Sequence, residues 1–114
     1  MENNKTIGKL IRRLRKEKNL SLRDLAKRVK MSHVNITHIE NDRVSTNTKT
    51  LIDLAKALDF NMDKMLAVAN EVGDDIKKII KDKPDAVPKF LRTTKNFNNR
   101  DWERLEKMAA DINK

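Results

Sequence analysis

The two histidines of this chain, His33 and His38, are the side chains best suited to exchange protons, bind metal or hydrogen-bond near neutral pH. A spacing of five residues does not place two side chains on one face of a helix, so the pair makes a poor metal site. The chain has no cysteine, which excludes disulfides, thiolate zinc sites and cysteine nucleophiles. We therefore predict neither a metal site nor a cofactor, and we interpret the histidines as contacts to a ligand or as ordinary exposed residues.

No catalytic motif accompanies the histidines. The sequence has no glycine-rich phosphate loop, no H-E-x-x-H pattern and no spaced pair of carboxylates. We therefore predict a binding protein and not an enzyme.

The charge balance favours a polyanionic partner. The formal net charge is +9, and residues 1–60 hold fourteen Lys and Arg against seven Asp and Glu. Such a balance suits nucleic acid or an anionic membrane surface. No apolar run approaches the roughly 20 residues of a membrane span, and no signal peptide is visible. We expect a cytoplasmic protein without a membrane partner, which meets its polyanion through the N-terminal half.

The hydrophobic pattern predicts helices to position these residues, since the chain contains only two Gly and two Pro. Apolar residues at helical spacing predict a first helix over residues 6–18, whose opposite face carries Lys9 and Arg12. Ser21 can cap a second helix, with Asp24 in the capping-box position. After a short break at Lys30, Ser32 can cap a third helix of about ten residues.

Five further helices follow from similar signals. We expect a fourth to start at Asn47 or Thr48, and a fifth to be capped by Asn61 and closed by Gly73. Met62 and Met65 are then core residues of the fifth helix. The remaining signals are the cap at Asp74, the break at Pro84, and a last helix near Asn98 with Phe97 and Trp102 at hydrophobic-staple positions and Asp101 in the capping-box position.

The third predicted helix has an unusual outer face. Ile36 and Ile39 point inward, and at 100° per residue the opposite side carries Val34, Thr37, His38 and Asn41. Two short helices joined by a tight turn form a helix-turn-helix, in which Ala26 permits close approach of the third helix. A small, mostly polar face beside a cationic helix suits the major groove of DNA.

The run LSLRDLAKRVKMSHVNITHIEND, continued by TLIDLAKAL, resembles the Cro and phage-repressor type of helix-turn-helix, also called the Xre family. The resemblance is ungapped from about Ile7 to Leu66. It is carried by the basic pattern of the first helix (Arg12, Leu14, Arg15), the pair Leu25–Ala26, the run Ser32 to Ile36, the pair Ile39–Glu40 and the helix Thr50 to Leu58.

The resemblance implies an all-α fold. A five-helix, phage-repressor-like DNA-binding domain would span residues 1–73, and residues 74–114 would form a C-terminal helical extension for dimerisation or partner binding.

The family's DNA contacts can be transferred by position. They imply base reading by His33, Val34, Thr37 and His38, and phosphate contacts by Ser32, Asn41 and Arg43. The family often has Gln at the start of the second helix, where this chain has Leu22, which cannot hydrogen-bond. That phosphate contact is therefore either lost or taken over by Arg23. Lys9 and Arg12 could also contact phosphate or simply form a solvated face.

Two structural features follow from the same resemblance. Arg15 and Glu40 are expected to form an ion pair between the first and third helices. Lys30 and Asp42 stand where the family usually has Gly, so Lys30 should be strained by roughly 1 kcal/mol in a left-handed conformation.

The predicted function is that of a sequence-specific transcriptional regulator, a repressor that binds a palindromic operator as a homodimer. The last helix would supply the dimer contact through Trp102, Leu105, Ala109 and Ile112. Alternatively, this stripe packs on Phe90, Leu91 and the fifth helix of its own chain, which would still allow one edge to contact a partner. An alternative is an antitoxin or adaptor whose C-terminal helices bind a protein partner, with DNA binding for autoregulation.

Overall fold

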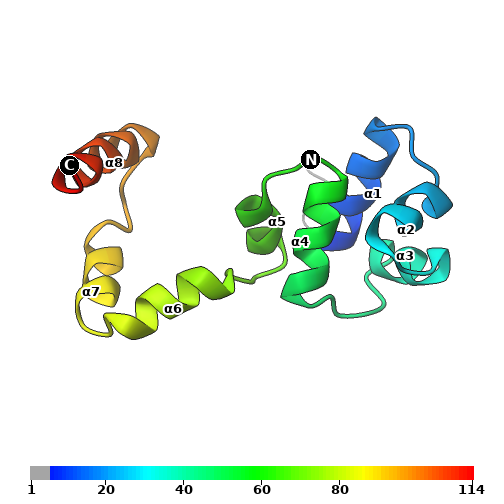
Figure 1. Cartoon of the computed structure of the whole chain (residues 1–114), viewed down its shortest axis with the longest axis horizontal. Coiled ribbons are helices and arrows are strands. Elements are labelled where there is room, and N and C mark those ends of the chain that lie inside the picture. The colour runs from blue at the N-terminus through cyan, green and yellow to red at the C-terminus, as the bar shows by residue number, and fades with distance from the viewer. Residues whose placement is uncertain (1–5) are drawn as a thin grey trace. The chain divides into compact units, whose positions relative to one another are not determined.

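The computed structural model describes residues 6–114, and within this range every regular element is a helix (Figure 1). The prediction of an all-α fold is confirmed. The helices are α1 (Ile7–Glu17), α2 (Leu22–Val29), α3 (His33–Glu40), α4 (Thr48–Ala57), α5 (Met62–Val68), α6 (Asp74–Asp82), α7 (Ala86–Thr93) and α8 (Asn99–Ile112). They form two compact units, of which the first ends at Asp74 and the second spans Asp75–Lys114. No helix in the described range is long and apolar enough to cross a membrane.

Five of these helices begin at a side-chain cap at or next to the start that the sequence predicts. In each case the cap side chain accepts a hydrogen bond of 2.8–3.1 Å from the backbone N–H three residues later. The five caps are Ser21, Ser32, Asn47, Asn61 and Asn98. Asp24 and Asp101 complete the capping boxes of α2 and α8. Local side-chain chemistry therefore sets these starting points.

The end of α5 differs from the prediction. The helix stops at Val68, and the left-handed residue beyond it is Asn70, with φ 59°, whereas no described glycine has a positive φ. Asn tolerates this conformation next best after Gly, so the helix ends before the chain reaches Gly73. Asp74 is consequently the first residue of α6 and not its cap. Met62, expected in the core, is 43% exposed because only Met65 and Leu66 of α5 face inward.

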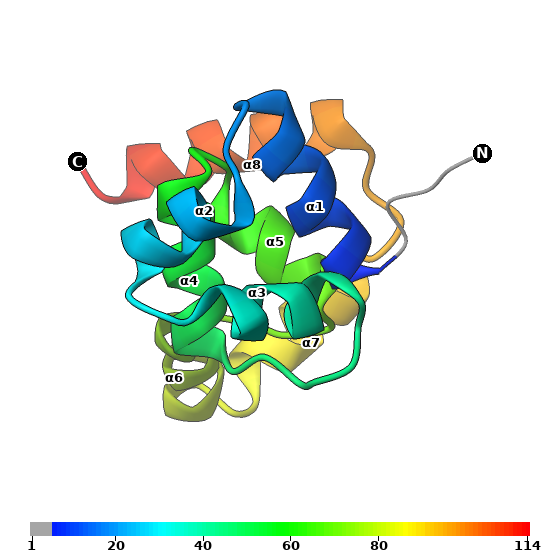
Figure 2. The ribbon, with the colours of Figure 1, turned by 90° about the vertical axis from the view of Figure 1, so that its right-hand side faces the viewer.

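The N-terminal unit has an aliphatic core to which α1–α5 all contribute. Its buried residues are Leu10, Ile11, Leu14, Leu25, Ala26, Ile36, Ile39, Leu51, Leu54, Ala55, Leu58, Met65 and Leu66. Burying one large aliphatic side chain stabilises a fold by about 1.5–3 kcal/mol. The core therefore fixes α3 against α1 and α2. In Figure 2, α3 crosses the front of this unit beside α2.

The C-terminal unit has no comparable core. Within residues 75–114, all of which the structure describes, Thr94 is the one buried residue, and its hydroxyl donates to backbone carbonyls of its own helix. Large apolar side chains of α6, α7 and α8 remain 40% or more exposed, among them Ile79, Phe90, Trp102 and Met108. At its staple position Trp102 could also have been a core residue, but within the single chain it is not one.

Candidate nucleic-acid interface

The turn between α2 and α3 sets the geometry of the candidate interface. Lys30 adopts the left-handed conformation, with φ 56° and ψ 47°, and the N–H of Met31 donates to the carbonyl of Ala26 at 3.0 Å. Ala26 is 5% exposed on the inner side of α2, and α3 packs against that helix. The short turn and small side chain together hold α3 across α2, as a helix-turn-helix requires.

The inner and outer faces of α3 are sharply different. Ile36 and Ile39 are buried, whereas Val34 is 51% exposed on the opposite side. The other predicted base readers, His33, Thr37 and His38, are partly exposed. The Thr37 hydroxyl donates to the His33 carbonyl at 3.0 Å, so its proton is already used inside the helix. The structure thus presents all four predicted readers on α3 with different capacities for hydrogen bonding.

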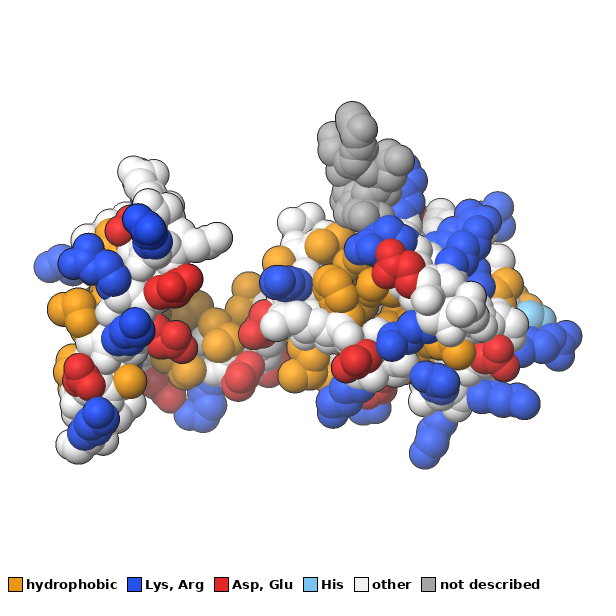
Figure 3. Space-filling view, turned by 90° about the horizontal axis from the view of Figure 1, so that it is seen from above, with side chains coloured by type: hydrophobic (Ala, Val, Ile, Leu, Met, Phe, Trp, Pro, Cys, Tyr) orange, Lys and Arg blue, Asp and Glu red, His pale blue; other side chains and the backbone are white. Residues whose placement is uncertain are grey.

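The predicted phosphate contacts lie at the surface of the same unit. Lys9, Arg12, Arg23, Asn41 and Arg43 are exposed. In the space-filling view, Lys and Arg side chains are spread over this unit, and one of them lies beside the visible histidine (Figure 3). Such a distribution suits a phosphate backbone, which attracts cations irrespective of sequence.

At two helix starts near this surface, side chains already accept hydrogen bonds from backbone N–H groups. Ser32 Oγ accepts from Asn35 N at 3.1 Å, which leaves its hydroxyl proton available for a phosphate. At α2, Asp24 accepts from the Ser21 N–H at 2.9 Å. That backbone hydrogen bond, followed by the one from the Ser21 side chain, holds the pKa of Asp24 below its usual value. Because a carboxylate already sits at the start of α2, a phosphate contact in this region depends on neighbouring cations such as Arg23.

The structure brings Arg15 and Glu40 together in a bidentate ion pair. Arg15 Nε donates to Glu40 Oε2 at 2.6 Å and Nη2 to Oε1 at 3.0 Å, while Nη1 donates to the Leu20 carbonyl at 2.9 Å. The two residues are 8% and 7% exposed. The pair therefore links α1 to the end of α3 from inside the domain and does not face a ligand.

A second link between α1 and α3 was missed by the sequence analysis. The Gly8 N–H donates to Asp42 Oδ1 at 2.9 Å. A Cβ atom on Gly8 would lie 2.6 Å from that oxygen and from the carbonyl oxygens of Ile39 and Glu40. Gly8 was a usable signal, since glycine inside a helix is unfavourable unless a close approach requires it. Its partner, 34 residues away, had no signal of its own.

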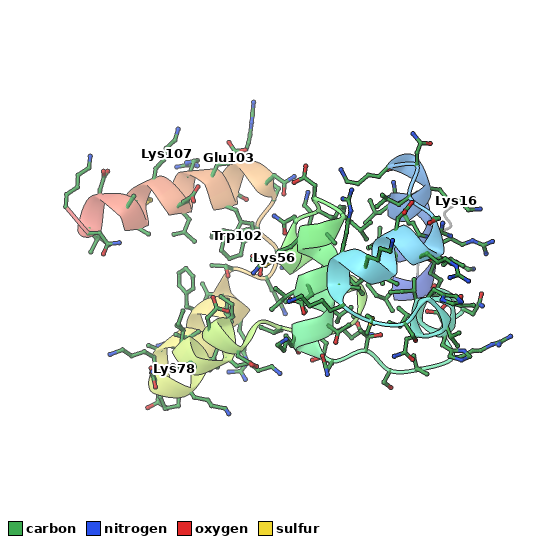
Figure 4. All side chains as sticks on the ribbon, turned by 45° about the vertical axis from the view of Figure 1, so that its right-hand side comes forward. Lys16, Lys56, Lys78, Trp102, Glu103 and Lys107 are labelled. Carbon is green, nitrogen blue, oxygen red and sulfur yellow. The ribbon has the colours of Figure 1, made fainter. Side chains whose placement is uncertain are left out.

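The C-terminal unit contains an apolar groove between α7 and α8. Its apolar lining residues are Phe90, Trp102, Leu105, Met108, Ala109 and Ile112. Phe97 and Trp102 meet edge to face with ring centroids 5.8 Å apart, as a hydrophobic staple would place them. Trp102 lies on the side of α8 that faces α7, and Lys107 lies on the opposite side (Figure 4). Phe90 therefore covers part of the apolar face of α8, and the rest of that face is exposed to solvent.

Comparison with known proteins identifies the family of this chain. The profile of a helix-turn-helix family matches residues 11–65. The "ImmF control region 10 kDa protein" of Bacillus phage phi105 is 40% identical over 79 residues, which are 66% of this chain and 88% of that protein. The chain belongs to this helix-turn-helix family. The Cro and Xre resemblance is confirmed, and this regulator of transcription binds DNA through its helix-turn-helix.

A solved structure agrees with the fold of the regulator. A chain of the "SinR protein/SinI protein complex" superposes with a TM-score of 0.53, covering 96% of this chain and all of that one. The sequence identity is 20%, so this likeness concerns the fold alone.

Proposed function

We propose that this regulator is a repressor that binds a palindromic operator as a dimer, with α3 in the major groove. The observation that carries the proposal is the outer face of α3, where Val34 is 51% exposed beside the partly exposed Thr37 and His38. The apolar side chain of Val34 is exposed to solvent, while Ile36 and Ile39 on the other side of α3 are buried in the core. A thymine methyl and the edges of neighbouring base pairs would match that face.

Affinity and sequence selection come from different residues in this proposal. Lys9, Arg12, Arg23, Ser32, Asn41 and Arg43 would contact phosphates. His33, Val34, Thr37 and His38 would contact bases. Phosphate contacts fix the register of a protein on the duplex, and base contacts carry the sequence information. The second group lies on α3, while the first surrounds it on α1, α2, the start of α3 and the loop after it.

The proposed dimer contact is the open face of α8, with a second copy of this chain as its occupant. Ile112 is 84% and Met108 62% exposed, and Trp102 is 40% exposed. A unit without an internal core gains its missing apolar burial when two such faces meet, at about 25 cal/mol for each Å² removed from water. A single helix-turn-helix reads few base pairs, so two linked copies would read two half-sites about 34 Å apart.

The test is to recover the DNA that the protein binds. Tagged full-length protein is purified with sheared genomic DNA, the bound fragments are sequenced, and the double variant Val34→Ala/His38→Ala serves as the control. We expect an enriched palindromic sequence with wild type and its loss with the control. A promoter that carries the site should be silenced by wild type in a reporter strain. Enrichment of non-palindromic fragments, or an activated promoter, would contradict the proposal.

A protein partner on the C-terminal helices is the second candidate, as in an antitoxin or adaptor. The exposed groove favours it, and the solved structure with a similar fold is itself a complex of two proteins. The mass of the purified chain separates the candidates. A dimer supports the repressor, whereas a monomer that gains mass only with a different protein supports the adaptor.

A further inference from the structure

One ring nitrogen of His38 is enclosed without a hydrogen-bond partner. Among the described residues, two side-chain polar atoms share this condition, His38 Nδ1 and Thr46 Oγ1. The other ring nitrogen of His38, Nε2, is not enclosed in this way, and the side chain as a whole is partly exposed. The ring therefore turns Nδ1 inward and leaves Nε2 as the nitrogen that a ligand can reach.

This orientation selects one form of the neutral ring. A neutral imidazole carries its proton on one nitrogen, which donates, while the other accepts. A proton on Nδ1 would be a buried N–H with no acceptor, and orphaned buried N–H groups are rarer in proteins than under-satisfied acceptors. A lone pair on Nδ1 leaves no such N–H. The proton consequently belongs on Nε2, at the surface of α3.

The neighbouring side chains make this donor important. Val34, one helical turn earlier, has no hydrogen-bonding group. Thr37 donates its hydroxyl proton to the His33 carbonyl at 3.0 Å. On the outward face of α3, the Nε2–H of His38 is thus a donor that is free for a base, as is the exposed amide of Asn41.

We propose that His38 reads guanine, as an obligatory donor from Nε2 to the N7 and O6 edge. This inference rests on the proposed function, in which α3 enters the major groove. Guanine offers two adjacent acceptors there and no donor. Cytosine offers an amino donor, adenine places an amino group beside N7, and thymine places a methyl group beside O4. A side chain that can only donate therefore fits guanine better than the other bases.

The form of the ring is tested in the full-length protein without DNA. Long-range ¹H–¹⁵N spectra at neutral pH distinguish the two neutral forms of a histidine by their cross-peak patterns. We expect the Nε2–H pattern for His38, assigned by its absence in His38→Gln. His33, whose ring has no enclosed nitrogen of this kind, provides the comparison within the same sample. An Nδ1–H pattern for His38 would overturn the inference and leave the proposed function untouched.

The base is tested with the recovered operator. Each guanine is replaced in turn by 7-deazaguanine, which lacks N7, or by inosine, which keeps N7 and O6 as a control. At one guanine in each half-site we expect wild type to lose about five- to tenfold in affinity with 7-deazaguanine and little with inosine. His38→Ala should show no further loss at that position, while His33→Ala should lose affinity as wild type does. If no guanine shows a loss that depends on His38, the inference is wrong. If no sequence is enriched at all, the proposed function fails instead.

Discussion

Arg15 and Glu40 show how single residues hold α3 in place. Removing one partner of a buried ion pair costs about 3–5 kcal/mol, because the remaining charge stays buried without compensation. We predict a loss of this size in the free energy of unfolding for Arg15→Ala, measured by denaturant titration. The bidentate geometry and the exposures of 8% and 7% place the pair in this class.

A matched control for Arg15→Ala is available on the same helix. Arg13 and Glu17 form an exposed pair at 2.7 Å, and such a pair contributes about 0.3–0.5 kcal/mol. Arg13→Ala should therefore change stability little. Equal losses for the two variants would show that the Arg15 pair behaves as a surface contact.

At the scale of helices, the contact between α1 and α3 depends on Gly8. In an exposed helix, Gly→Ala stabilises by about 1 kcal/mol. Here the added Cβ would meet backbone oxygens of Ile39 and Glu40 at 2.6 Å, so α1 must move away from α3. We predict that Gly8→Ala destabilises the fold by about 1–3 kcal/mol. Thermal unfolding gives the sign directly.

The control for Gly8→Ala keeps the geometry and changes the charge. Asp42→Asn retains an acceptor for the Gly8 N–H and tolerates the left-handed φ of 57°. It should alter stability by a few tenths of a kcal/mol. An unfolding temperature for Gly8→Ala at or above that of wild type would contradict the close packing of the two helices.

The same helices show what the sequence could predict. Helix starts were predictable because a cap such as Ser21 or Asn98 acts on a backbone group three residues away. The end of α5 was not, because Asn70 and Gly73 can both terminate a helix and only core packing decides between them. Met62 has core spacing and is exposed for the same reason. The outer face of α3 followed from periodicity, but the enclosed Nδ1 of His38 depends on tertiary packing.

For the molecule as a whole, we expect charge to govern the strength of DNA binding. Each phosphate neutralised adds about 0.9 to the slope of log K against log salt concentration. Residues 1–60 carry an excess of seven cationic side chains. We predict affinity that falls steeply with salt in a fluorescence titration, and a slope reduced by about 1 in Arg43→Ala. A binding constant that barely changes between low and physiological salt would refute this account of affinity.

The proposed assembly is a second property of the whole molecule. All hydrophobic core residues found in the described range lie between Leu10 and Leu66, so a chain ending at Asn96 keeps that core. We predict that this truncated chain is a folded monomer in light scattering, with weaker operator binding and unchanged half-site preference. The reason is that the truncated chain lacks α8, whose apolar face is the proposed contact between the two copies.

Two substitutions in the full chain refine the truncation. Trp102→Ala removes a ring from the open side of α8, whereas Lys107→Ala changes the opposite side. The first should raise the dissociation constant of the dimer and the second should leave it unchanged. A truncated chain that stays folded and dimeric would place the dimer contact elsewhere.

In the proposed function, α3 selects the sequence while the cations around it supply affinity. The most direct measurement compares Val34→Ala and Arg43→Ala with wild type on the recovered operator and on a scrambled duplex of the same composition. We predict that Val34→Ala loses about 1–3 kcal/mol on the operator and little on the scrambled duplex. Arg43→Ala should weaken both by similar amounts. If Val34→Ala lowered both affinities alike, α3 would not be the element that reads the sequence.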